Sequence, residues 1–192
     1  CDEPLSDVQR IQVETALSKK PLVQPEILSE FLDELVYPLY FFDFETFTEA
    51  IPRFEGQRPY MQMPFQYSLH ILHQNGELVH KEYLGDEHID PRPGLVMQML
   101  EDLGEQGTII AFNQSFEISR IKDLARDFED YEPGLLKLIP RFRDLIVPFR
   151  ELGYYHPDFN GSFSIKSVLP AMFPNDPELD YKQLEIQNGG MA

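Results

Sequence analysis

A chain of 192 residues with 42% hydrophobic and 12% aromatic residues can bury the core of one domain, or of one domain with a small appendage. No apolar run reaches the roughly 20 residues of a membrane span, and the N-terminus lacks the pattern of an export signal, so we expect no membrane partner. The formal net charge of −17 argues against a large phosphate-binding surface, because such surfaces rest on Lys and Arg. Carboxylates gathered around divalent cations would weaken this argument.

Cysteine content and the two ends of the sequence bear on its setting. Cys1 is the only cysteine and cannot form an internal disulfide, which is compatible with a reducing compartment, so we expect a cytoplasmic protein. The sequence does not begin with Met and ends at Gly-Gly-Met-Ala. We therefore expect a piece of a longer chain, with upstream and downstream domains as partners.

Residues 1–36 predict a helical lead-in or linker. Apolar residues recur near helical spacing, and Pro21 and Pro25 separate the segment into one or two amphipathic helices. The polar helical pattern gives way to an apolar run at residue 37, and we expect residues 37–192 to form a single domain.

The elements of that domain follow from periodicity. The apolar run 37–47 favours a central strand buried on both faces. Alternation around Asn75-Gly76 predicts a hairpin, and helical spacing with a Ser115 N-cap predicts a later helix. In chain order we expect strands at 37–47, 65–73 and 77–84, a helix at 93–105, a strand at 108–112, helices at 115–128 and 136–151, a loop at 154–157 and a short helix from Ser164. This order, beginning with a meander, is that of a ribonuclease H-like α/β domain with a mixed β-sheet flanked by helices.

Asp43 and Glu45 are the first candidate functional residues. They stand two apart on an expected strand, so both side chains emerge on the same face. Carboxylates within an apolar strand are costly unless divalent cations with a preference for oxygen compensate them. Alternatively, both acids lie at a strand end, solvated or paired with Lys or Arg.

A second group lies where the strand at 108–112 gives way to a helix. Asn113 ends the strand, and Glu117 falls in the first helical turn, where the helix dipole favours an acid. An acid there is also ordinary helix chemistry. Joined to Asp43 and Glu45, however, Glu117 would complete a site for two metal ions that activate water against a phosphodiester.

Two motifs resemble those of DEDD-type 3′-5′ exonucleases. The run Phe-Phe-Asp43-Phe-Glu45-Thr is similar to their first motif, and Asn113-x-x-x-Glu117-x-x-x-Ile121 has the spacing of their second. Much of 37–192 also resembles an uncharacterised bacterial family, DUF2779. The resembling stretches are Asp43-Phe-Glu-Thr, Arg58-Pro-Tyr, Pro64-Phe-Gln-Tyr-Ser, Asn113-Gln-Ser-Phe-Glu, Arg143-Asp-Leu, Tyr154-Tyr-His-Pro, Gly161-Ser-Phe-Ser-Ile-Lys-Ser-Val-Leu-Pro and Asn188-Gly-Gly-Met-Ala.

The exonuclease resemblance implies hydrolysis of a terminal phosphodiester of nucleic acid by two Mg²⁺ or Mn²⁺ ions. Asp43 would bridge both ions, and Glu45 and Glu117 would each hold one. Glu117 departs from the family, which usually carries Asp. The fourth acid is not assigned: it is expected beyond residue 192 in a Tyr-Cys-x-x-Asp-Thr segment, so that this chain is C-terminally truncated, while Tyr154 and Asp158 have the right spacing but the wrong place in the chain.

Other residues are assigned by their place in these motifs and loops. Thr46, Asn113, Tyr155, His156 and Lys166 are expected to bind substrate, and Asp144 to act as an auxiliary acid outside the metal shell. The aromatic residues would stack on bases, and Lys166 would meet a phosphate near a helix N-terminus. Each has a plainer alternative: the aromatic residues fill a loop contact, Lys166 is a surface lysine, and Asp144 is a solvated acid at a helix start.

The histidines and the acidic balance leave a rival hypothesis. His70, His73, His80 and His88 follow the hairpin without zinc-ligand spacing, so we expect strand and loop residues rather than ligands. The Glu117 departure and the acidic surface favour a non-catalytic ribonuclease H-like module that binds nucleic acid or a protein. We expect the metal-dependent nuclease, with this chain alone having little activity.

Overall fold

The structure is a computed structural model that describes residues 4–176 and 179. The chain divides into two compact units. Residues 35–144 form one, here called the sheet unit, and residues before 35 join those after 144 in the second unit. The first division lies beside the expected one at 36/37, and the second falls inside the range 37–192 that the sequence predicts as a single domain.

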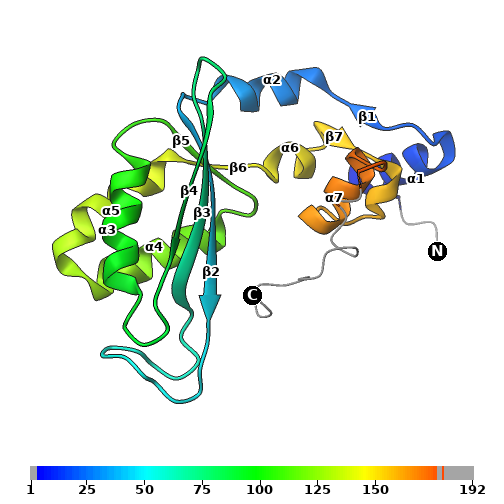
Figure 1. Cartoon of the computed structure of the whole chain (residues 1–192). Coiled ribbons are helices and arrows are strands. Elements are labelled where there is room, and N and C mark those ends of the chain that lie inside the picture. Colours follow the sequence, from blue (N-terminus) through cyan, green and yellow to red (C-terminus); the bar gives the residue numbers. More distant parts are fainter. Residues whose placement is uncertain (1–3, 177–178, 180–192) are drawn as a thin grey trace. The chain divides into compact units, whose positions relative to one another are not determined.

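The sheet unit is built on a five-stranded mixed sheet in the order β4-β3-β2-β5-β6 (Figure 1). Its strands are β2 (Leu39–Phe47), β3 (Met63–Leu72), β4 (Leu78–Leu84), β5 (Thr108–Ala111) and β6 (Phe142–Asp144). The first three form an antiparallel meander, whereas β5 and β6 run parallel to β2 on its other side. The expected hairpin is confirmed: Gly76 turns the chain with a φ of 87°, a conformation that glycine adopts without strain.

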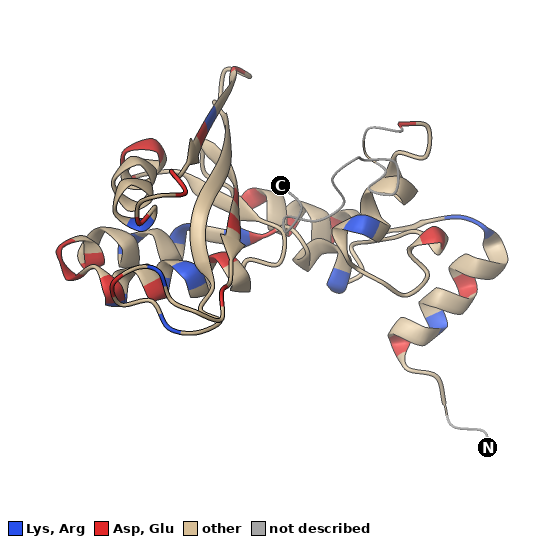
Figure 2. Ribbon diagram, turned by 60° about the horizontal axis from the view of Figure 1, so that its bottom comes forward, with Lys and Arg blue, Asp and Glu red and all other residues tan. Residues whose placement is uncertain are grey.

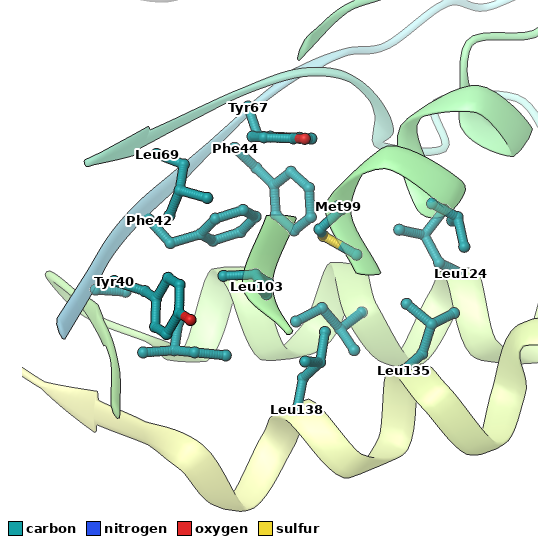
Figure 3. Close-up of a cluster of buried hydrophobic side chains, with 14 of the residues drawn as sticks. Tyr40, Phe42, Phe44, Tyr67, Leu69, Met99, Leu103, Leu124, Leu135 and Leu138 are labelled. Atoms are coloured by element: carbon teal, nitrogen blue, oxygen red, sulfur yellow. The ribbon is translucent and has the colours of Figure 1, made fainter. Parts of the chain in front are cut away.

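Helices cover one face of this sheet. They are α3 (Arg92–Leu103), α4 (Ser115–Asp127) and α5 (Glu132–Leu138), with 3₁₀ turns η1 (Glu129–Tyr131) and η2 (Ile139–Arg141) at the ends of α5. Figure 3 shows the core between them: Phe42 and Phe44 of β2 and Tyr67 of β3 point toward Met99 of α3 and Leu135 of α5. Strand residues two apart face the same way, so alternate residues of β2 build this core.

The other face of β2 is open, and the prediction of a strand buried on both sides was wrong. Phe42 and Phe44 are buried, but Phe41 and Asp43, which alternate with them, are exposed. The strand is central in the sheet because it has a hydrogen-bonded neighbour on each edge. It is nevertheless one-sided, because the helices of the sheet unit pack against a single face.

The prediction of one helix over residues 136–151 was also wrong. Helix α5 ends at Leu138, η2 contains Pro140, and residues 142–144 form β6, which pairs with β5. Proline interrupts helical hydrogen bonding. Arg141 reinforces the turn, because its guanidinium donates to four backbone carbonyls at the end of α3 and in the loop that follows, namely those of Leu103, Gly104, Gln106 and Gly107.

The second unit contains the expected N-terminal helices. Its elements are α1 (Asp7–Ser18), β1 (Leu22–Val23), α2 (Pro25–Asp33), α6 (Val147–Arg150), β7 (Tyr154–Tyr155), η3 (Pro157–Phe159) and α7 (Ile165–Met172). Ser6 caps α1 through a capping box with Gln9. The lead-in also supplies β1, which pairs antiparallel with β7. No helix among residues 4–176 is long and apolar enough to cross a membrane.

Candidate functional site

Asp43 and Glu45 lie on the open face of β2. Asp43 stands opposite Ser68 of β3, and Glu45 stands opposite Gln66. The Asp43 side chain keeps access to solvent, yet the protein around it removes enough water to raise its pKa. Burial also raises the pKa of Glu45, and the charge of Asp43 adds to the rise. A negative charge is therefore disfavoured at both acids. The same is expected of carboxylates at a cation site that holds no cation.

A β-bulge follows the acid pair. Glu45 pairs with Gln66, but Thr46 pairs with Pro64, so that Phe65 is an extra residue on β3. The Thr46 hydroxyl donates to Oε1 of Gln62 at 2.5 Å. Bulges bend the strand that carries the extra residue and redirect its side chains, and the register between β2 and β3 shifts immediately after Glu45.

The corner between β5 and α4 is held by Asp144. Asn113 turns the chain there with a φ of 67°. Its backbone N–H donates to Oδ1 of Asp144 at 2.7 Å, and the N–H of Gln114 donates to Oδ2 at 3.1 Å. Asp144 is the last residue of β6, not an acid at a helix start. Its carboxylate thus fixes the start of α4 relative to the parallel edge of the sheet.

Glu117 is the buried acid of this corner. Its side chain belongs to the first turn of α4, it is 4% exposed, and its Oε2 atom has no hydrogen-bond partner. Burial raises its pKa to about 7; a hydrogen bond from its own backbone N–H opposes part of this rise, and the charges of Asp43 and Asp144 add smaller increases. Side chains from β2, α4 and β6 therefore share one electrostatic environment.

This environment fits a divalent cation in its chemistry. Carboxylate oxygens are the ligands that Mg²⁺ and Mn²⁺ prefer, and Glu117 Oε2 is a buried oxygen without a partner. The described residues contain no group of three His, Cys, Asp or Glu side chains placed to hold one metal ion. The sheet unit thus provides donors and negative charge rather than a preformed three-ligand cage.

The remaining expected substrate-binding residues, apart from Thr46 and Asn113, belong to the second unit. Tyr155 is buried there, its ring contacts Phe159, and its hydroxyl accepts from the N–H of Gly161 at 3.2 Å. His156 Nδ1 accepts from the N–H of Asp158 at 3.2 Å. These contacts correspond to the plainer alternative of aromatic residues that fill a loop contact.

Lys166 is exposed in the first turn of α7. Because the sheet unit and the second unit are each described by themselves, substrate binding by Tyr155, His156 and Lys166 stays a prediction.

Sequence reasoning missed the role of Asp144 because it missed β6. The available signal was the pair Pro140 and Pro148, which are spaced too closely for a long uninterrupted helix between them. Sequence reasoning also missed that Glu117, besides lying in the first turn of α4, is buried. Burial of that position could be inferred only once the sheet against which α4 packs was known.

The comparisons place this site in a family without an assigned activity. Residues 40–164 match the family described as a domain of unknown function, DUF2779. The chain belongs to the DUF2779 family. This range contains both acidic motifs, whereas the resembling stretch 188–192 lies outside the described residues.

A similar curated protein is the uncharacterized protein UU173 of Ureaplasma parvum serovar 3 (strain ATCC 700970), which is 30% identical over an alignment covering 78% of this chain. The chain spans 24% of the length of that relative, as expected of a domain in a longer protein. No solved structure matches the chain.

Proposed function

We propose that this DUF2779 domain is a ribonuclease H-like module that hydrolyses terminal phosphodiesters of nucleic acid with the help of Mg²⁺ or Mn²⁺. The observation that carries the proposal is the state of Glu117. It is buried with an oxygen atom that lacks a partner, and this burial, with smaller contributions from the charges of Asp43 and Asp144, raises its pKa to about 7. Such an arrangement is unfavourable without a cation and becomes favourable with one.

The topology of the sheet supports the same proposal. A three-stranded meander is extended by two parallel strands on the other side of β2, as expected of a ribonuclease H-like sheet. The acids of the two exonuclease-like motifs come from β2 and from α4, the helix that follows β5. Residues far apart in sequence thus contribute to one electrostatic environment at neighbouring strands.

Each residue has a definite part in the proposed site. Asp43, Glu45 and Glu117 would hold the cations, which, when bound, would activate water and stabilise the leaving oxygen. Asp144 would position Glu117 indirectly, because it holds the backbone of Asn113 and Gln114. A fourth acid would complete the site, so full activity is expected of a longer family protein that carries one.

Charge distribution bears on how nucleic acid would be held. Figure 2 shows Lys and Arg intermixed with Asp and Glu over the helices of the sheet unit. Many of these cations are engaged, as Arg92 is with Asp90 and Asp127. Phosphate contact would therefore rest on the bound cations and on other domains of the longer protein.

The test is Mn²⁺-dependent release of nucleotides from labelled oligonucleotides by a longer family protein that carries the expected C-terminal segment. Asp43→Asn should reduce the rate by orders of magnitude, whereas Glu105→Gln, which changes an exposed acid after α3, should leave it unchanged. Activity without divalent metal, or an unaffected Asp43→Asn variant, would refute the proposal.

A non-catalytic ribonuclease H-like binding module is the second candidate. It is favoured by the lack of a three-ligand group among the described residues and by Glu117 in place of the usual Asp. Such a module should bind an oligonucleotide or a protein equally well in EDTA. Binding that persists in Asp43→Asn, together with the absence of nucleotide release from the longer protein, would favour it over the nuclease.

A further inference from the structure

His70 and His80 face one another across the β3–β4 hairpin. They are directly paired in the antiparallel register, and their rings stack with centroids 4.4 Å apart and planes 27° apart. Both side chains are exposed on the open face of the sheet. The sequence predicted only strand and loop residues at these positions, because spacing along the chain does not reveal a pairing across strands.

The two imidazole rings offer nitrogen ligands from neighbouring strands. A neutral imidazole carries one unprotonated ring nitrogen, which binds borderline metals such as Zn²⁺, Co²⁺ and Ni²⁺.

The surroundings favour a dication. Asp43 and Glu82 flank Ser68 in the next row of the sheet, so carboxylates lie beside the histidine pair. The neighbouring cation, Lys81, belongs to the opposite face of β4, where it binds Asp102 at 2.8 Å. Negative charge is therefore available on the open face, and the nearby lysine does not oppose it there.

Ser68 provides a contact of the kind that metal-bound histidines usually have. Its Oγ lies 3.3 Å from Nε2 of His80. A histidine that binds metal through one ring nitrogen typically donates the other N–H to an oxygen, which fixes the ring. With Nε2–H directed to Ser68, Nδ1 of His80 is the nitrogen left for an ion.

We propose that His70 and His80 form a two-ligand binding site for a borderline transition-metal dication, with Zn²⁺ the principal candidate and water completing the coordination. With Zn–N bonds of about 2.0–2.1 Å, tetrahedral ligand nitrogens lie roughly 3.3 Å apart. The two rings must therefore tilt from stacking until their planes converge on the ion, a rotation available to exposed side chains. The site uses nitrogen ligands and is distinct from the oxygen ligands proposed for Mg²⁺ or Mn²⁺.

The test is calorimetric titration of the untagged 192-residue chain with Zn²⁺ alone, in a Cys1→Ser background because a thiolate also binds zinc. One saturable site that depends on the two histidines is expected. His70→Gln and His80→Gln should each weaken binding at least about tenfold, whereas His73→Gln, at the turn of the same hairpin, should not. Thermal melts without metal establish that each variant is folded.

A further arm separates this site from the carboxylates. Zinc binding should persist in Asp43→Asn/Glu117→Gln, whereas it would be lost there if the carboxylates held the ion. Unchanged zinc affinity in both His70→Gln and His80→Gln, or no saturable site in the parent chain, would overturn the proposal. Loss of zinc binding in Asp43→Asn/Glu117→Gln alone would assign the ion to the carboxylates and also overturn it.

Discussion

The two faces of β2 differ completely in what they contribute, although their residues alternate along the chain. Phe42 and Phe44 point into the core (Figure 3), whereas Asp43 and Glu45 point to the open face. Burial of the aromatic side chains stabilises the fold. The acids on the other face have raised pKa values because their charge is disfavoured there. Residues that stabilise the fold thus alternate with the candidate metal ligands along β2. Substitutions in the first group should lower the free energy of unfolding, whereas substitutions in the second should leave it nearly unchanged.

The largest effect on stability is expected at Phe44. Phe44→Ala removes a ring that is 3% exposed and that packs edge-on against Phe42. Loss of a buried aromatic side chain leaves a cavity and costs about 3–5 kcal/mol. Urea unfolding monitored by circular dichroism measures this cost, with Phe41→Ala on the open face as the matched control. A loss below about 1 kcal/mol would contradict the assignment of Phe44 to the core.

Glu117 should make the stability of the chain depend on pH. Its pKa rises from an ordinary 4.5 to about 7 in the folded protein, so between these values the folded state holds a proton that the unfolded state releases. Stability should therefore fall as pH increases from about 4.5 to about 7 and then level off. At about 1.4 kcal/mol per pKa unit, the fall is about 3 kcal/mol.

Glu117→Gln isolates this contribution. The variant should match the parent near pH 4.5, where Glu117 is protonated, and exceed it in stability at pH 8 without metal. Unfolding free energies measured across the range, with Glu105→Gln as control, provide the comparison. Parallel pH profiles for the parent and Glu117→Gln would contradict a raised pKa at Glu117.

Asp144 should contribute to stability through its hydrogen bonds at the start of α4. Asp144→Ala removes an acceptor from the N–H groups of Asn113 and Gln114, and hydrogen bonds to a charged group contribute about 1.5–3 kcal/mol. We expect a loss of about 2 kcal/mol and faster amide hydrogen exchange at Asn113 and Gln114. Unchanged exchange at both amides would show that Asp144 does not hold this corner.

Asp43→Asn should have the smallest effect on stability. The substitution keeps the shape of an exposed side chain and relieves repulsion with Glu45 and Glu117. The change in unfolding free energy at pH 7 should lie within about 0.5 kcal/mol of zero, or be slightly stabilising. A large destabilisation, comparable to that of Phe44→Ala, would make Asp43 a structural residue and remove the contrast between the two faces.

Local patterns sufficed for much of the sheet unit. The apolar run 37–47 located β2, and the Asn75-Gly76 turn located the β3–β4 hairpin. The spacing of Asp43 and Glu45 placed both on one face. These features depend on neighbours in the chain, and the corresponding predictions are confirmed by the strand assignments and register.

Features that depend on distant pairing were not predictable from the sequence. Strand β6 is three residues long and exists through its pairing with β5. Without it, Asp144 could not be placed at the amides of Asn113 and Gln114. The stacking of His70 on His80 follows from the hairpin register and from two particular side-chain conformations, which the spacing of histidines along the chain does not encode.

The most direct test of the central claim, that Asp43, Glu45 and Glu117 hold a divalent cation, is paramagnetic broadening by Mn²⁺. Amide spectra of the isotopically labelled chain at pH 7.5 would be recorded during titration with Mn²⁺ and, as a diamagnetic reference, Mg²⁺. We predict saturable broadening centred on Asp43, Glu45 and Glu117, lost in Glu117→Gln and retained in Glu105→Gln. Broadening that is absent around these residues, or is unchanged in Glu117→Gln, would contradict the account.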